Sequence, residues 1–165
     1  MVTAYLGLGS NLGNRLAFLR GGRDSLVSRF DILLRRVSGV YETEAVGGPA
    51  DNPPFLNAVL EIDTPLSPRE LLAACLAVED EFGRTRPAEW APRTLDIDLL
   101  LYGDVVIDEP ELQIPHPHLQ ERVFVLAPLK EIAPELVHPV LHKTIAALAG
   151  ELHLPTGVVP LRPTW

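Results

Sequence analysis

The succession of hydrophobic and polar positions along the chain predicts alternating strands and helices. Short stretches rich in apolar and strand-forming residues predict strands over Thr3–Leu8, Ile32–Thr43 and Phe55–Asp63, and the first strand is expected to be broken by Gly9. The turn sequence SNLGNR leads into a helix predicted over Arg15–Phe30.

A second helix has the clearest boundaries of all the predicted elements. Ser67 is a typical N-cap residue, Pro68 suits the first helical position, and Glu70 completes a capping box. The helix is predicted to run to Phe82, with Gly83 as its C-terminal stop.

The apolar stripe of this helix carries one acidic residue. The stripe is predicted to contain Leu72, Cys75, Leu76 and Phe82, and Glu79 falls on it. Because the helix dipole disfavours a negative charge near a helix C-terminus, Glu79 is a candidate site residue, unless it simply pairs with an arginine.

A strand predicted over Leu95–Leu101 contains two carboxylates although it is otherwise apolar. Side chains alternate between the faces of a strand, so Asp96 and Asp98 share one face with Cα atoms about 7 Å apart. Two like charges at that spacing are costly unless a cation lies beside them, and magnesium takes oxygen ligands of this kind. Carboxylates exposed to water or paired with arginine are the alternative. The other face is predicted to be core and to carry Leu95, Ile97, Leu99 and Leu101.

The C-terminal third is predicted to add a hairpin and helices. The turn Tyr102–Asp104 is expected to fold a strand over Val105–Asp108 back as a hairpin, and a proline-rich loop follows over Pro110–Leu119. Helices are predicted in Gln120–Ile132 and Lys143–Gly150, and the tail is too rich in proline for a helix.

The order of elements over the first two thirds is strand, helix, strand, strand, helix, strand. This βαββαβ order is that of a ferredoxin-like antiparallel sheet with helices on one face. We therefore expect an α+β fold, a ferredoxin-like αβα sandwich with an additional C-terminal hairpin and helices.

Length and composition indicate one soluble domain over residues 1–165. The chain has 165 residues, of which 47% are hydrophobic, which is enough for a core. No apolar run approaches membrane length and no signal-peptide pattern begins the chain, so we expect a cytoplasmic protein without membrane association. Cys75 is the single cysteine, which excludes an internal disulfide, and it is interpreted as a buried helix residue.

The charges point to a small anion as ligand. The formal net charge of −8 argues against nucleic-acid binding. Arg84, Arg86 and Arg93 nevertheless cluster just before the acidic strand, with Trp90 among them. Arginine matches phosphate oxygens well, and arginines beside acidic metal ligands are typical of sites for a metal–triphosphate complex. A solvated basic loop is the alternative.

Other nucleotide and metal motifs are missing or weak. The chain contains no P-loop sequence, and Gly7–Gly13 has the wrong spacing for a dinucleotide fingerprint. His116 and His118 lie two residues apart, which indicates a metal site only weakly. A phosphate donor is the better functional interpretation for one of them, and His118 is interpreted as an ordinary surface histidine.

Several stretches of the chain resemble the 6-hydroxymethyl-7,8-dihydropterin pyrophosphokinase family of folate biosynthesis. They are YLGLGSNLGNR, FLNAVLEI, EDEFGRTR, PRTLDIDLLLYG and IPHPHLQERVFVLAPLKEIAPELVHP, and they extend from Ala4 to about Pro139. The resemblance implies transfer of the β,γ-pyrophosphoryl unit of ATP to the pterin hydroxymethyl oxygen, with release of AMP. It also implies two magnesium ions. We expect a monomer, because one site is complete within one chain.

The resemblance assigns roles to individual residues. Asp96 and Asp98 resemble the magnesium ligands, and one of them is expected to orient or deprotonate the pterin hydroxyl. Asn57 resembles the residue that reads the hydrogen-bonding edge of the pterin. The catalytic residues are expected to be Arg84, Arg93, Asp96 and Asp98. The ATP contacts are expected to be Glu79, Arg84, Arg86, Trp90, Arg93, Ile97, His116 and Arg122. The pterin contacts are expected to be Thr43, Val46, Phe55, Asn57, Asp96 and Phe124, of which Thr43 and Val46 act through their backbones.

Two alternatives remain at this point. A nucleotidyltransferase also combines an early Gly-Ser turn with an Asp-x-Asp strand, but the two elements are normally close in sequence, and Gly9-Ser10 is far from Asp96 here. A non-enzymatic ferredoxin-like binding or assembly domain would leave the acidic and arginine residues together unexplained.

Overall fold

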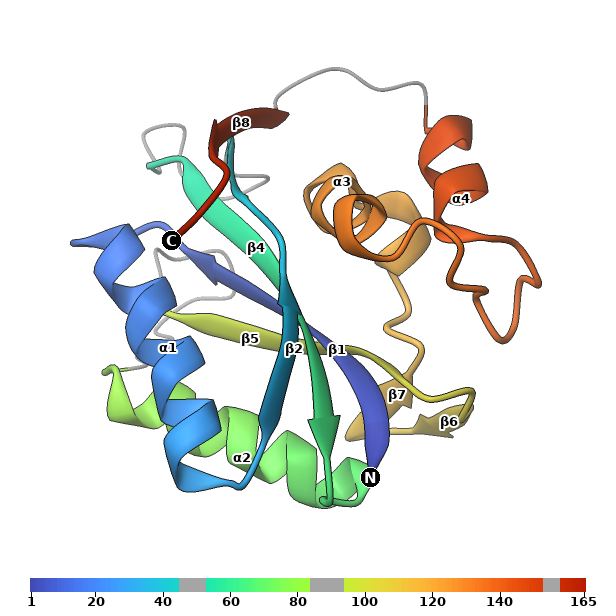
Figure 1. Ribbon diagram of the computed structural model, residues 1–165, viewed down its shortest axis with the longest axis horizontal. Helices are drawn as coiled ribbons and strands as arrows, with labels where there is room; N and C mark the ends of the chain where they lie inside the picture. Colours follow the sequence, from blue (N-terminus) through green and yellow to red (C-terminus); the bar gives the residue numbers. More distant parts are fainter. Residues whose placement is uncertain (45–52, 84–93, 153–157) are drawn as a thin grey trace.

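The computed structural model describes residues 1–44, 53–83, 94–152 and 158–165. Figure 1 shows a central sheet between helices. In chain order the elements are β1 (Val2–Ser10), α1 (Arg15–Arg29), β2 (Leu33–Val37), β3 (Val40–Thr43), β4 (Phe55–Thr64), α2 (Pro68–Glu81), β5 (Asp96–Tyr102), β6 (Ile107–Glu109), β7 (Leu112–Ile114), a 3-10 turn (Leu119–Glu121), α3 (Val123–Ile132), α4 (Ile145–Glu151) and β8 (Val158–Arg162).

The main sheet is antiparallel in all its pairings and confirms the predicted order of elements. Its strands lie in the order β5-β1-β4-β3-β8, and β2 pairs with the far end of β4. The single strand predicted over Ile32–Thr43 is wrong, because it is divided into β2 and β3. Ser38 interrupts the ladder: its Oγ accepts from the Val59 amide at 2.8 Å, while the amide of Gly39 turns to the Glu131 carboxylate on α3 at 3.1 Å.

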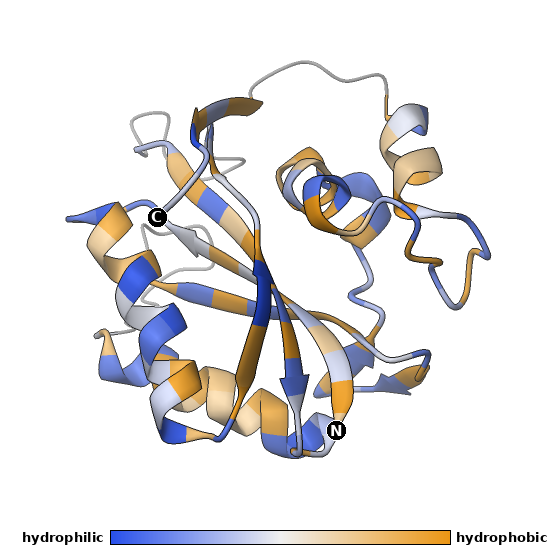
Figure 2. Cartoon of the chain, viewed as in Figure 1, coloured by the Kyte–Doolittle hydropathy of each residue, from blue (hydrophilic) through white to orange (hydrophobic). Residues whose placement is uncertain are grey.

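Two hydrophobic cores lie on opposite faces of the sheet. Leu6, Leu8 and Leu60 belong to the core beneath α1 and α2, whereas Tyr5 and Val59 belong to the core beneath α3 and α4. The alternation of these neighbours along β1 and β4 follows from the two-residue period of a strand. Figure 2 shows the resulting alternation of apolar and polar segments along the strands. The last two helices therefore cover the face that the first two leave open.

Strand β1 is longer than predicted. We expected a break at Gly9, but β1 continues to Ser10, and Gly9 pairs with Asn57 on one side and Asp96 on the other. Ladder pairing on both sides compensates for the poor strand preference of glycine.

The predicted orientation of Leu101 is wrong. Tyr5 pairs with Leu101 and Leu6 pairs with Leu99, so Leu100 is an extra residue in β5. Such a β-bulge shifts the alternation by one residue. Leu101 therefore joins Leu100 in the core under α3 and α4, while Asp96 and Asp98, which precede the bulge, keep their predicted common face.

The predicted hairpin forms with a different partner. β6 pairs with β7 rather than with β5, and β7 lies inside the stretch that we expected to be loop. Both C-terminal helices are confirmed as α3 and α4. The described part of the proline-rich tail, residues 158–165, contains no helix and adds the edge strand β8 beside β3. None of the helices in the described part of the chain is long and apolar enough to cross a membrane.

Helix α2 begins as predicted but buries a slightly different face. Both hydrogen bonds of the capping box between Ser67 and Glu70 are present. The predicted stripe is wrong at Leu76, which is 39% exposed. Cys75 is buried, and this burial raises the pKa of its thiol, as expected for an inert core residue. The buried residues of the helix are Leu71, Ala74, Cys75, Val78 and Glu79.

Candidate active site

The antiparallel register aligns three candidate positions across the sheet. Asp96 on β5 lies opposite Gly9 on β1, and Gly9 lies opposite Asn57 on β4. Directly paired residues point to the same face of a sheet. Asp98 and Gly7 form the next row of the same face. In Figure 1 this is the end of the sheet where β1 ends and β4 and β5 begin.

Glu79 reaches the acidic strand from helix α2. Its side chain is only 2% exposed, and its Oε2 accepts from the backbone amide of Ile97 at 2.7 Å. Ile97 lies between the two aspartates, and its side chain is buried in the core under α1 and α2. The N–H and C=O of one residue in an antiparallel strand point to the same side, so the carbonyl of Ile97 also faces away from β1. Glu79 thus joins α2 to the first residues of the acidic strand.

Asn57 is held by a neighbouring hydroxyl. Its Nδ2 donates to Thr43 Oγ1 at 2.8 Å, and both residues are buried, with exposed fractions of 7% and 5%. Thr43 on β3 pairs directly with Phe55 on β4. The predicted pterin contacts Thr43, Phe55 and Asn57 are therefore neighbours on two adjacent strands.

His116 is attached to the acidic strand through its backbone. Its amide donates to the carbonyl of Leu100 at 2.9 Å, and its ring Nδ1 accepts from the amide of His118 at 3.1 Å. Burial, together with the positive charge of Arg122 and then His118, lowers the pKa of His116 to about 4. A neutral ring that accepts at Nδ1 carries its proton at Nε2, so His116 is a neutral N–H donor at pH 7. His118 is exposed, as predicted.

Arg122 is the N-cap of α3, and Phe124 lies in the first turn of that helix. The Arg122 guanidinium lies 4.0 Å from Asp98 Oδ2, and its central carbon lies 5.6 Å from the centre of the Phe124 ring. Phe124 is partly buried beside the core under α3 and α4. The start of α3 therefore places a positive charge next to the second aspartate and an aromatic ring behind it.

The two aspartates fit magnesium rather than a metal held wholly by protein. Among the described residues no group of three or more His, Cys, Asp or Glu side chains could hold a metal. Magnesium commonly uses only one or two carboxylates and completes its shell with water and substrate phosphates. Asp96 and Asp98, two residues apart on one face, provide that donor set.

Five predicted residues cannot be placed in this way. Val46, Arg84, Arg86, Trp90 and Arg93 lie outside the described residues. The catalytic role of Arg84 and Arg93 and the contacts expected of the other three residues therefore stay predictions from the sequence.

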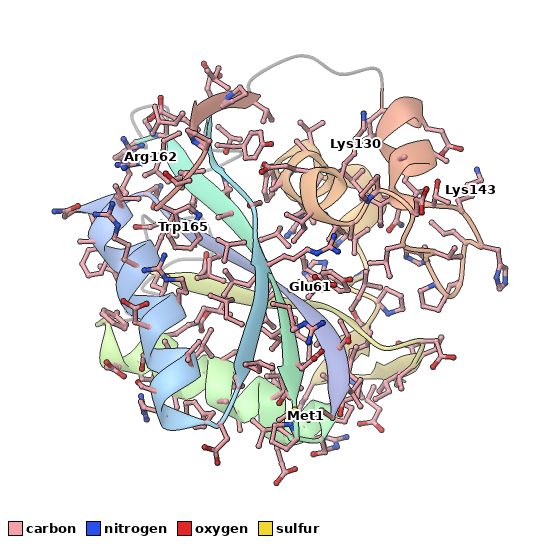
Figure 3. All side chains as sticks on the ribbon, in the orientation of Figure 1. Met1, Glu61, Lys130, Lys143, Arg162 and Trp165 are labelled. Atoms are coloured by element: carbon pink, nitrogen blue, oxygen red, sulfur yellow. The ribbon has the colours of Figure 1, made fainter. Side chains whose placement is uncertain are left out.

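A cavity of about 570 Å³ lies elsewhere and is not this site. Leu56, in the core under α1 and α2, contributes to its lining together with Arg15, Arg162 and Thr164. Figure 3 shows Arg162 and Trp165 near this end of the molecule. None of the candidate ATP or pterin residues that the structure describes lines the cavity.

Sequence reasoning overlooked Gly9 and Gly7. They carry no chemistry, so no motif for acids, bases or ligands includes them. The pattern Gly-Leu-Gly inside a strand was the available signal, because glycine there often marks a close approach of a ligand or another backbone.

Comparison with known proteins identifies relatives over nearly the whole chain. A family model described as 7,8-dihydro-6-hydroxymethylpterin-pyrophosphokinase (HPPK) matches residues 5–134. A 2-amino-4-hydroxy-6-hydroxymethyldihydropteridine pyrophosphokinase of Synechocystis is 43% identical over 160 residues, which cover 97% of this chain and 80% of that protein. An Aquifex aeolicus protein of the same name is also 43% identical, over 92% of both chains.

Solved structures show the same fold at much lower identity. The wild-type HPPK-DHPS of Plasmodium falciparum superposes with a TM-score of 0.71 and 17% identity. The match covers 91% of this chain but only 44% of the Plasmodium chain, so this chain spans less than half the length of that protein. This likeness supports the mixed α/β architecture with an antiparallel sheet.

Proposed function

The chain belongs to the 7,8-dihydro-6-hydroxymethylpterin-pyrophosphokinase family, and on that premise we propose how its residues carry out the family's reaction. It transfers the pyrophosphoryl group of ATP to the hydroxymethyl oxygen of 6-hydroxymethyl-7,8-dihydropterin in folate biosynthesis. The bond from that oxygen to the β-phosphorus forms, the bond from the β-phosphorus to the bridging oxygen of the α-phosphate breaks, and AMP leaves. The observation that carries the proposal is the alignment of Asp96, Gly9 and Asn57 across three strands.

That alignment places a phosphate side and a pterin side next to each other. Asp96 and Asp98 on β5 would hold two magnesium ions, which would supply positive charge to neutralise the phosphates. Asn57 on β4 reads the hydrogen-bonding edge of the pterin. The pterin ring itself lies between the rings of Phe55 and Phe124. Asp96 is adjacent to both sides, so the pterin hydroxyl is held near the phosphate, and holding reactants in place contributes much of the rate in such reactions.

The remaining contacts bind and orient ATP. Neutral His116 donates a hydrogen bond from Nε2 to a phosphate oxygen and does not act as an acid in the reaction. Arg122 adds positive charge beside Asp98, and the outward carbonyl of Ile97 is a backbone acceptor for ATP. A loose phosphoryl-transfer transition state requires positioning and charge stabilisation more than a strong base. Arg84 and Arg93 clamp the phosphates, and Arg86 and Trp90 close over them and exclude water.

The fold class, the domain organisation, the location and the oligomeric state are part of the same proposal. We assign the sheet to the ferredoxin-like class and residues 1–165 to a single catalytic domain that acts as a cytoplasmic monomer. The strand order β5-β1-β4-β3 with two connecting helices on one face supports the first assignment. The presence of both substrate sides on one chain supports the monomer.

A product assay tests the proposed function directly. Purified protein is mixed with ATP, magnesium and 6-hydroxymethyl-7,8-dihydropterin, and the nucleotides are resolved by chromatography. We expect AMP only when both the pterin and magnesium are present. Release of inorganic pyrophosphate instead of AMP would indicate a nucleotidyltransferase. Absence of both products, without magnesium-dependent ATP binding, would favour a non-enzymatic binding domain.

A further inference from the structure

We propose that Thr43 and Gly9 are positioning residues that fix the amide of Asn57 in one orientation and thereby set recognition of the pterin. The inference rests on the proposed function, because it concerns the pterin side of that site. Neither the hydroxyl group of Thr43 nor Gly9, which has no side chain, takes part in the chemical step.

Thr43 orients Asn57 from the β3 side. The Asn57 Nδ2 donates to Thr43 Oγ1 at 2.8 Å, so the nitrogen of the amide points towards β3. Both side chains are buried, so water does not compete freely for this hydrogen bond. One N–H of the amide is engaged in this way, and its second N–H and its carbonyl oxygen remain for a ligand.

Gly9 makes room for the carbonyl oxygen on the opposite side. A Cβ atom built on Gly9 would lie 3.1 Å from Asn57 Oδ1 and 3.5 Å from Phe55 Cδ1. Since β4 lies between β3 and β1, the amide spans the gap from Thr43 to the bare backbone of Gly9. The contact with Oδ1 is tighter than most contacts of a Cβ atom, whereas the contact with Phe55 is ordinary, so a side chain at position 9 would press on the Asn57 oxygen.

The fixed amide presents one acceptor and one donor side by side. A pterin carries a ring N–H next to a ring carbonyl, and this lactam edge requires the same pair in complementary order. A freely rotating amide would offer the reversed pair for part of the time and would lose discrimination, because a mismatched buried polar group is costly. Orientation of Asn57 is therefore what makes it selective.

Steady-state kinetics of four variants test this inference. Thr43→Val removes the hydroxyl and keeps the shape, and loss of one hydrogen bond should raise the KM for the pterin about 3- to 10-fold. Thr43→Ser restores the hydroxyl and should return that KM to within about 2-fold of the wild type. The KM for ATP should stay within about 2-fold of the wild type in both variants, because Thr43 contacts only the pterin side.

Gly9→Ala is the second arm, with Gly7→Ala as its matched control. The added methyl group at position 9 displaces Asn57 Oδ1, so the KM for the pterin should rise at least about 10-fold. A Cβ on Gly7 would lie 3.5 Å from the Leu100 side chain, which is ordinary contact, so the KM should rise less than about 3-fold. In a purely structural role Gly9→Ala would be neutral or stabilising, because alanine suits a strand better than glycine.

The outcomes separate this inference from the function on which it rests. An active wild-type protein whose pterin KM is unchanged by Thr43→Val and Gly9→Ala would overturn the inference alone. Equal increases in both KM values would also overturn it, since they would indicate general distortion. Thermal unfolding of each variant identifies any loss of fold, and Thr43→Ser gives the decisive comparison if Thr43→Val unfolds. A wild-type protein that releases no AMP would remove the proposed function and the inference together.

Discussion

At the scale of single residues, the two aspartates show how a strand period encodes a site. Asp96 and Asp98 were predicted to share a face, and the register places both opposite glycines of β1 on that face. Their expected chemistry follows from two carboxylates held close together, which is an oxygen donor set that suits a divalent cation. The bulge at Leu100 comes after them, so it leaves this geometry intact.

Replacement of either aspartate should abolish turnover and spare the fold. Asp96→Asn or Asp98→Asn removes a carboxylate ligand without changing the side-chain shape, so we expect AMP release to fall at least about 100-fold. Asp104→Asn, at an exposed turn just after the same strand, is the control and should retain activity. Near-normal turnover in either site variant would contradict the assignment as magnesium ligands.

His116 should remain neutral far below the usual pKa of histidine. Its pKa is lowered to about 4 from 6.5, so its ring signals in an NMR titration should be constant from pH 8 to about 5.5 and move near pH 4. A midpoint near 6.5 would contradict its burial as a neutral donor.

The same shift has a consequence for stability. Between about pH 6.5 and 4 the unfolded chain binds more protons than the folded protein, so stability falls as the pH falls through this range. The contribution of His116 is fully present above pH 6.5, and its loss is at most about 1.4 kcal/mol per pH unit. Urea denaturation of the wild type and His116→Gln at several pH values measures the difference. Parallel pH profiles of the two proteins would rule the effect out.

At the scale of elements, Glu79 connects helix α2 to strand β5. Sequence reasoning marked it as a misplaced carboxylate near a helix end, and the structure shows that it accepts from the strand amide between the two aspartates. An edge strand exposes such amides, and a buried acceptor satisfies one of them. Glu79 can therefore hold the acidic strand in position whether or not it also contacts ATP.

Variants of Glu79 should separate these two roles. Glu79→Gln keeps an oxygen acceptor for the Ile97 amide and should stay close to wild-type stability, whereas Glu79→Leu leaves the amide unpaired and should cost about 1–3 kcal/mol. Urea denaturation measures both. Equal stability of the two variants would argue against the structural role. A Glu79→Gln protein that keeps wild-type stability but binds ATP more weakly would favour a direct contact.

Local signals predicted some elements well and others poorly. The capping box of Ser67 and Glu70 depends on residues three positions apart, so the start of α2 was predicted correctly. The division of β2 from β3 depends on contacts of Ser38 and Gly39 with residues on β4 and α3, which are distant in the sequence. The partner of β6 likewise depends on tertiary packing rather than on its own turn.

At the scale of the whole molecule, one sheet supports two cores. The face under α1 and α2 carries the larger core and receives Glu79 from α2, whereas the face under α3 and α4 also carries the two aspartates at its open end. Arg122, directly before α3, lies beside Asp98, and His116 is hydrogen-bonded to the backbone of the same strand, so the candidate site requires both the sheet and the C-terminal layer.

The two cores should unfold as one cooperative unit. Leu126 on α3 and Leu19 on α1 are fully buried on opposite faces, and replacement of either by alanine should cost about 2–5 kcal/mol. Leu76→Ala, at a position that is 39% exposed, is the control and should cost much less. Circular dichroism should show a single transition whose midpoint falls in both core variants. Two separate transitions would contradict a single domain.

The sequence alone determined the family and the order of elements, and it supplied the candidate residues for the chemistry. These properties reside in local patterns: a capping box, a strand period and a run of family motifs that the comparisons confirmed. Only the tertiary structure decided which residues meet. The register of β1 with β4 and β5 sets Gly9 between Asp96 and Asn57, and Thr43 reaches Asn57 from a fourth strand. Strand pairing joins residues that are far apart along the chain, and no local pattern states which pairs form.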